Sequence, residues 1–448
     1  MRTTINLGEG AELVQIDGTA PSAASRRDFL SRAGFSFAAA TLAACRAPVQ
    51  HAVPLLAASD QLVPGVSNWY ATTCGGCPAS CSLLVKQRDG RPIKVEGNDR
   101  SDLFGGGTCA TGQATVLSLY DGERLRGPLW KGQEVSWQQI DERVRAALPP
   151  PGDQRQVVLL SDTVTSPSTL EIVGEWRKQH PNFRHVRYDA VSLSAIRAAN
   201  RESFGRAVIP HYAFDKAKVI VGLEADFLAT WLSPVEFAHQ YARSRSADRP
   251  CLHIQFESGL SPTGSKADVR VAVAPSDLGI VAVALLRRVA RRAGITGLPD
   301  ADPIRDLRTL DAIVEQLWSH RGQSLIVSGI QDTAVQVVVN ALNALLGNIG
   351  KTVDVARASF QRNGDDAAMA DLVAEMNRGE IHTLMLYGVN PLYDYSGAEL
   401  FAQGLAKTQL SISFSGTLDE TSSQAHAVCP DHHFLEAWGD AEPVDSAP

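Results

Sequence analysis

The chain has 448 residues, 44% of them hydrophobic, and a formal charge of −7. That length allows two or three globular domains, and the acidic balance gives no electrostatic basis for binding nucleic acid. The seven cysteines are spaced too unevenly for a disulfide framework.

The first 44 residues read as an export signal built around a twin-arginine pair, Arg26 and Arg27. The apolar run at 33–44 is too short to cross a bilayer, which needs ~20 apolar residues. The run ends in Leu-Ala-Ala-Cys, which is typical of a bacterial lipobox and has Cys45 as its last residue. We therefore expect export by the twin-arginine route and lipid attachment at Cys45, on the periplasmic side of the cytoplasmic membrane. The alternatives are plain cleavage with an unmodified Cys45 and a retained amphipathic anchor.

A linker rich in Ala and Pro is expected at 45–67, and a small cysteine-containing module at 68–128. The cysteines of this module follow the pattern Cys-x2-Cys-x3-Cys-x27-Cys; they are Cys74, Cys77, Cys81 and Cys109. Three ligands from one tight loop and a fourth returned by a hairpin predict a 4Fe–4S cluster. Short strands at 82–86 and 93–96 would form that hairpin. A zinc site, which usually shows two Cys-x2-Cys pairs, and a pair of disulfides are the alternatives.

The rest of the chain alternates aliphatic runs with amphipathic segments. Strands are expected at 157–160, 186–188, 219–223, 252–256, 269–273, 325–328, 384–387 and 410–414. Helices are expected at 136–148, 168–179, 234–243, 278–292, 303–320, 333–346, 367–378 and 398–406. Continuous Val, Ile and Leu strands between helices predict parallel sheets covered on both faces. The predicted fold class is therefore α/β, with two interleaved doubly wound (Rossmann-like) domains at 129–155 with 323–448 and at 156–322.

Four loops follow predicted strands and contain Gly, Asn and Asp, at 222–226, 328–332, 387–391 and 415–419. Ligands bind at the carboxyl ends of such strands, although ordinary turn chemistry explains the same residues. None of the loops is a complete Gly-x-Gly-x-x-Gly motif, so a nicotinamide site is not expected.

The cysteine pattern, followed by Gly112, resembles the N-terminal four-iron domain of the molybdopterin oxidoreductase (DMSO reductase) superfamily. Segments 219–237, 263–268, 387–393 and 418–440 resemble one branch of it, the molybdopterin-like half of the large iron–sulfur subunit of alternative complex III. That branch belongs to a membrane quinol-oxidising assembly. The resemblance implies a ferredoxin-like multi-cluster subunit, a quinol-binding membrane subunit and cytochrome c-type subunits as partners. The C-terminal β-barrel domain of the superfamily is not expected within this chain.

A molybdenum bis-pterin guanine dinucleotide is not the expected cofactor. Superfamily members commonly place Lys or Arg two residues after the fourth cysteine, where this chain has Thr111. No cysteine lies between Cys109 and Cys251 to bind molybdenum, so Ser192 and Ser194 are the candidate molybdenum ligands. The alternative is that one of these serines caps a helix and the other is a surface hydroxyl.

We expect an electron-transfer subunit with one 4Fe–4S cluster that is not catalytic on its own. A catalytic molybdenum chain of the polysulfide- or thiosulfate-reductase type and a structural or assembly subunit are the alternatives. Cys429, His432 and His433 could form half of a zinc site, but a complete site would need ligands from elsewhere.

Overall fold

The computed structural model describes residues 63, 65–246, 250–295 and 307–445. The chain from Val63 onward forms one compact unit. Among the described helices, none is both long enough and apolar enough to span a membrane.

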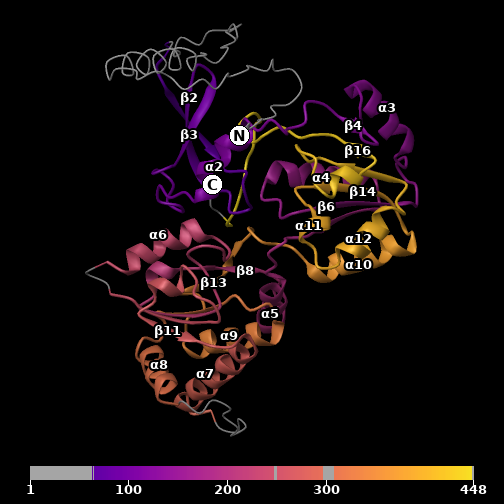
Figure 1. Ribbon diagram of the computed structural model, residues 1–448. Helices are drawn as coiled ribbons and strands as arrows, with labels where there is room; N and C mark the ends of the chain where they lie inside the picture. The colour runs from indigo at the N-terminus through magenta and orange to yellow at the C-terminus, as the bar shows by residue number, and fades with distance from the viewer. Residues whose placement is uncertain (1–62, 64, 247–249, 296–306, 446–448) are drawn as a thin grey trace, which may run out of the picture. The chain divides into compact units, whose positions relative to one another are not determined.

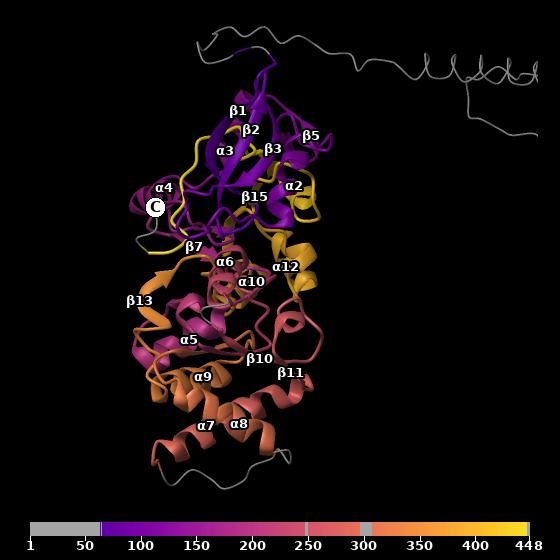
Figure 2. The same ribbon diagram turned by 90° about the vertical axis from the view of Figure 1, so that its left-hand side faces the viewer.

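A small antiparallel sheet opens this unit, with the strand order β1-β2-β3. Its strands are β1 (Asn68–Thr73), β2 (Ser82–Arg88) and β3 (Arg91–Gly97). Asp89 and Gly90 both have positive φ, as a tight hairpin turn between β2 and β3 requires. Helix α2 (Ala110–Leu119) packs against β3 (Figure 2). The predicted hairpin is confirmed, whereas β1 and α2 had no clear sequence signal.

The second sheet is parallel and has four strands, in the order β11-β10-β9-β12. Its strands are β9 (Val219–Leu223), β10 (Leu252–Glu257), β11 (Val269–Ala272) and β12 (Ser324–Ser328). Alternate residues of β9 pack into different hydrophobic cores. Val221 packs on one face of the sheet with three helices, α7 (Leu278–Arg292), α8 (Leu307–Ser319) and α9 (Thr333–Leu345). Ile220 packs on the other face with α6 (Pro234–Ser244). Both faces of this sheet are therefore covered, as its continuous apolar strands predicted.

A mixed seven-stranded sheet has the order β5-β4-β16-β15-β14-β6-β7. Its strands β4, β16, β14 and β6 are labelled in Figure 1. Its strands are β4 (Leu129–Trp130), β5 (Gln133–Glu134), β6 (Gln156–Ser161), β7 (Phe183–Arg187), β14 (Ile381–Tyr387), β15 (Leu410–Ser413) and β16 (Ala427–Val428). The five strands from β16 to β7 are parallel, and β4 pairs antiparallel with β16 and with β5.

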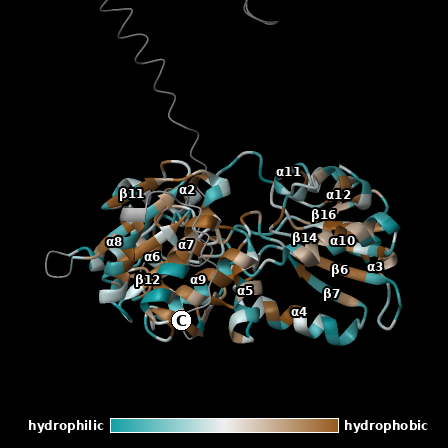
Figure 3. Cartoon of the chain, turned by 90° about the horizontal axis from the view of Figure 1, so that it is seen from below, coloured by the Kyte–Doolittle hydropathy of each residue, from teal (hydrophilic) through white to brown (hydrophobic). Residues whose placement is uncertain are grey.

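Helices cover both faces of the parallel part of this sheet. Val158 and Leu160 of β6 pack with α10 (Asp366–Arg378) and α12 (Ala398–Leu405). Val157 and Leu159 pack on the other face with α4 (Pro167–Gln179), and α3 (Trp137–Ala147) adjoins the β15 end. Hydrophobic residues gather on the strands and on the helix sides that meet them (Figure 3). The remaining longer elements are α5 (Ser194–Phe204), β8 (Ile209–Tyr212), β13 (Val353–Ser359) and α11 (Pro391–Asp394).

The α/β fold class is confirmed, but the predicted domain boundaries were wrong. β6 and β7 fall in the predicted 156–322 domain, yet β6 pairs with β14. β12 falls in the predicted 323–448 segment, yet it pairs with β9. The hydrophobic pattern of a strand shows which residues are buried but does not show which parallel strand is its neighbour.

Candidate functional site

The four predicted cluster cysteines come from two short stretches of the N-terminal module. Cys74, Cys77 and Cys81 lie in the loop between β1 and β2, and Cys109 caps the N-terminus of α2. The amide of Cys74 donates a hydrogen bond of 2.8 Å to the carbonyl oxygen of Cys81, which closes the loop. Cys74 and Cys81 are buried, whereas Cys77 and Cys109 are exposed, and all four are free thiols.

The thiols lie close enough to act on one another electrostatically. Burial raises the pKa of Cys74, and the neighbouring Cys77 and Cys109 raise it further. Burial likewise raises the pKa of Cys81 well above its ordinary value, and the other three cysteines add to the rise. A bound cation would offset the charge of thiolates at Cys74 and Cys81, and the iron of a cluster would supply that positive charge.

The backbone around the sulfurs is also suited to a cluster. The amide of Gly76 donates to Cys74 Sγ at 3.4 Å, and the amide of Gly112 donates to Cys109 Sγ at 3.3 Å. Such N–H···S bonds are among the protein groups that tune the reduction potential of an iron–sulfur cluster. The donor set and its surroundings fit a 4Fe–4S cluster.

Backbone segments approach each other closely behind the cysteines, and glycine permits this. A Cβ atom added at Gly97 would lie 2.5 Å from the carbonyl oxygen of Gly107 and closer still to the carbonyl group of Gly106. Gly105 has a φ of +53°, and a Cβ atom there would overlap the ring of His239. The glycine-rich return that leads to Cys109 therefore packs directly on the end of β3 and on α6.

The segment at 431–441 covers the cysteine loop, which the sequence did not indicate. Phe434 lies against Gly75, where an added Cβ atom would come within 2.8 Å of the Phe434 side chain. His433 Nε2 lies 3.0 Å from Ser118 Oγ on α2. Arg124 forms an ion pair with Glu436, 2.6 Å from Nη2 to Oε2. This segment holds an aromatic ring over the loop that carries Cys74 and Cys77.

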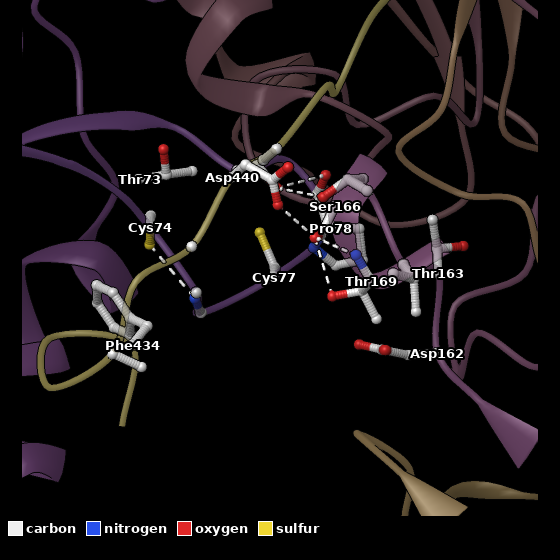
Figure 4. Close-up of a pocket in the computed structure, with 18 of the residues that line it drawn as sticks. Thr73, Cys74, Cys77, Pro78, Asp162, Thr163, Ser166, Thr169, Phe434 and Asp440 are labelled. Carbon is white, nitrogen blue, oxygen red and sulfur yellow. Dashed lines mark hydrogen bonds between the residues drawn. The ribbon is translucent and has the colours of Figure 1, made fainter. Parts of the chain in front are cut away.

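A cavity of about 310 Å³ opens beside the cysteine loop (Figure 4). It is lined by the loop from Cys74 to Pro78, the residues that follow β6, the start of α4 and the 431–441 segment. At the start of α4, Asp440 accepts hydrogen bonds from Ser166 Oγ at 2.5 Å and from the Ser168 amide at 3.1 Å. A carboxylate of the chain itself thus occupies the positive end of this helix, where the free N–H groups favour an anion.

The residues nominated for molybdenum are already engaged. Ser192 Oγ and Ser194 Oγ each donate to Asp366 Oδ2 at 2.7 Å, and the Ser194 amide donates to Ser192 Oγ at the start of α5. Thr111 is exposed on α2, and its methyl group would lie 3.9 Å from a Cβ atom added at Gly76. Thr111 is therefore beside the cysteine loop but places no cation there.

Cys429, His432 and His433 do not converge. Cys429 is half-buried and packs at the edge of a hydrophobic core, while His433 contacts Ser118. Within the described ranges, no group of three or more His, Cys, Asp or Glu side chains is arranged to hold a metal ion. The four cysteines form no single-ion site either, because their sulfurs in a 4Fe–4S cluster would bind separate irons. Arg26, Arg27 and Cys45 lie outside the described residues.

Comparisons with known proteins agree with the predicted resemblance. Residues 67–121 match the family described as molybdopterin oxidoreductase Fe4S4 domain. The chain is 22% identical, over 84% of its length and 60% of the relative, to the menaquinone reductase, molybdopterin-binding-like subunit of Nitratidesulfovibrio vulgaris. A stretch of 67 residues, 15% of this chain and 8% of the relative, is 39% identical to the molybdopterin-containing subunit of the arsenate respiratory reductase of Shewanella sp..

The fold has a counterpart among solved structures. Acetylene hydratase from Pelobacter acetylenicus superposes with a TM-score of 0.58 at 12% identity, covering 81% of this chain and 63% of that one. The chain therefore spans about three fifths of the length of the first curated relative and of this structure. The resemblance is confirmed at this level: residues 67–121 match the molybdopterin oxidoreductase Fe4S4 domain, and the α/β body shares its fold with acetylene hydratase.

Proposed function

We propose that this chain is an electron-transfer subunit of a membrane-associated respiratory oxidoreductase of the alternative complex III type. The observation that carries the proposal is the group of four free thiols, Cys74, Cys77, Cys81 and Cys109, which receives N–H···S bonds from Gly76 and Gly112. A 4Fe–4S cluster bound there would accept and donate one electron at a time.

The residues around the thiols have complementary tasks in this proposal. The buried Cys74 and Cys81 would fix the cluster in the module, and the two N–H···S bonds would stabilise negative charge on the sulfurs. The exposed Cys77 and Cys109 would leave one side open to a redox partner. Phe434 would limit the access of water to the loop on its own side.

The partners and location belong to the same proposal. A relative is named as a subunit of menaquinone reductase, which supports an assembly that exchanges electrons with a quinol pool. We propose a ferredoxin-like multi-cluster subunit, a quinol-binding membrane subunit and a cytochrome c-type subunit as partners. Arg26 and Arg27 would direct export, and lipid at Cys45 would hold the chain on the periplasmic side of the membrane.

A second candidate is a catalytic chain that binds molybdenum bis-pterin guanine dinucleotide. The observation in its favour is the cavity of about 310 Å³ that adjoins the cysteine loop. Against it stand the engaged Ser192 and Ser194 and the exposed, uncharged Thr111. A structural or assembly subunit, in which the cluster does not cycle, is the third candidate.

Metal analysis and low-temperature EPR on anaerobically purified protein separate these candidates. We expect about four irons per chain, as one 4Fe–4S cluster requires, together with a reducible signal and no molybdenum. Cys74→Ser should lose the signal, whereas Cys251→Ser, at a buried cysteine outside the module, should keep it. Stoichiometric molybdenum would make the chain catalytic. Iron without a signal that cycles on titration, or no iron at all, would leave the structural role.

The location has its own test. Replacing Arg26 and Arg27 together by Lys should leave the protein in the cytoplasm, and Cys45→Ala should release it from membranes as an exported soluble chain. Normal membrane attachment of both variants would contradict the export proposal.

A further inference from the structure

Asp162 is a carboxylic acid that lines the same cavity as the cysteine loop. It directly follows β6, and Cys74 and Cys77 share its cavity (Figure 4). Tyr387 also lines this cavity. The backbone of Gly388 leaves room for it, since a Cβ atom there would lie 2.7 Å from Asp162 Oδ1. In the part of the chain that the structure describes, no hydrogen bond reaches the carboxyl oxygens of Asp162.

Its neighbour Asp189 has the opposite surroundings. Asp189 is 2% exposed and accepts three hydrogen bonds, from the Thr163 amide at 3.0 Å, from Thr163 Oγ1 at 2.7 Å and from the Gly364 amide at 2.7 Å. These donors reach both carboxylate oxygens of Asp189, whereas the described residues donate no hydrogen bond to the carboxyl group of Asp162.

The groups that face Asp162 favour its neutral form. Burial raises the pKa of Asp162 to about 7; the charge of Asp189 adds to the rise, and the guanidinium of Arg362 opposes it. Tyr387 and Asp431, which also line the cavity, supply no positive charge. Two carboxyl groups with such different surroundings commonly divide into a fixed charge and a proton donor or acceptor.

We propose that Asp162 is a redox-linked proton site, which takes up a proton when the neighbouring cluster is reduced and releases it on oxidation. The inference rests on the proposed function, since it requires a cluster on the four cysteines. In the reducing step one electron from a one-electron donor enters the cluster, and a solvent proton forms an O–H bond with the Asp162 carboxylate. Oxidation reverses both events, so that charge and atoms balance.

The physical basis is the electrostatic coupling of two charges across one cavity. For any two groups separated by about 10 Å at an effective dielectric constant of about 20, an added negative charge raises the proton affinity of a carboxylate roughly ten- to twentyfold. Because such coupling is reciprocal, protonation of Asp162 favours the reduced cluster by the same factor.

EPR-monitored redox titration of the holoprotein at several values between about pH 6 and about pH 9 tests the proposal. The wild-type midpoint potential should fall as pH rises through the region near 7, and Asp162→Asn should remove that dependence. Asp440→Asn is the matched control, because it changes a carboxylate of the same cavity that is held by Ser166 and Ser168. It should keep the wild-type slope.

Redox-difference infrared spectra give an independent readout. Reduction should produce a carboxylic acid C=O band that shifts in D₂O, is absent from Asp162→Asn and persists in Asp440→Asn. A cluster whose potential does not depend on pH, or a slope that survives in Asp162→Asn, would overturn this inference alone. Absence of a cluster would overturn it together with the proposed function.

Discussion

Gly97→Ala places one methyl group at the closest backbone approach behind the cysteines. Gly97 ends β3, and the new Cβ atom would lie 2.5 Å from the Gly107 carbonyl oxygen, well inside the distances that real Cβ atoms show. The obstructing atoms are all backbone atoms of Gly106 and Gly107, so no side chain can rotate away. The conformation of Gly97 itself suits any residue, because its φ is not positive.

The substitution should therefore separate β3 from the return that carries Cys109. Overpacking usually costs about 1–3 kcal/mol, and a clash with rigid backbone belongs at the upper end of that range or above it. About 3 kcal/mol corresponds to a fall in the melting temperature of roughly 6–12 °C for a domain of 150–250 residues, and to more for a smaller module.

The assay is the iron content per chain and the temperature at which the visible absorption of the cluster is lost. Gly122→Ala is the control, since its Cβ atom would meet nothing within 4 Å and its φ is not positive. We expect the control to behave as wild type and Gly97→Ala to lose most of its iron or its thermal resistance. Full iron and an unchanged melting temperature in Gly97→Ala would refute the packing of Cys109 described above.

Three further predictions concern titratable groups. Because the folded pKa of Asp162 is raised to about 7, the free energy of unfolding of the wild type should fall as pH rises from about 4 to about 7. Asp162→Asn lacks this titration. In chemical denaturation its free energy of unfolding, relative to that of the wild type, should therefore be up to about 4 kcal/mol higher at about pH 8 than at about pH 4. The hydrogen bonds from Ser166 and Ser168 hold the pKa of Asp440 below its usual range. Asp440→Ala should therefore lower the free energy of unfolding by about 1 kcal/mol at neutral pH. Equal stability of the variant and the wild type at that pH would contradict the capping role of Asp440. This difference should vanish as pH falls through the lowered pKa. Burial raises the pKa of Cys251 to about 11, so iodoacetamide should leave this thiol unmodified in the folded protein and label it after unfolding, as peptide mass analysis would show.

Local sequence signals sufficed where neighbouring residues decide the structure. The spacing of Cys74, Cys77 and Cys81 and the Asp89-Gly90 turn act within one loop or hairpin, and their predictions needed no distant partner. The buried strands 157–160 and 219–223 were equally clear, because continuous Val, Ile and Leu runs suit only a strand covered on both faces.

Helix starts were predicted well for the same reason. Ser136 and Gln139 form a reciprocal capping box at the start of α3, and Pro167 takes the first turn of α4, where its missing N–H costs nothing. α5 was missed: its N-cap residue is Leu193, whose side chain cannot accept a hydrogen bond from the first turn.

Only the tertiary structure determined which distant segments meet. β6 pairs with β14, Phe434 covers Gly75, and Asp162 lies by Asp189 because the chain returns to the same sheet edge after long excursions. The sequence by itself determined most strands and the α/β class and predicted four cysteine ligands, because periodicity and spacing are local. It could not determine the strand order, because a parallel strand offers the same backbone hydrogen bonds to any neighbouring strand and only side-chain packing selects the neighbour. The cavity beside the cysteines depends on that strand order, so the sequence could not determine it either.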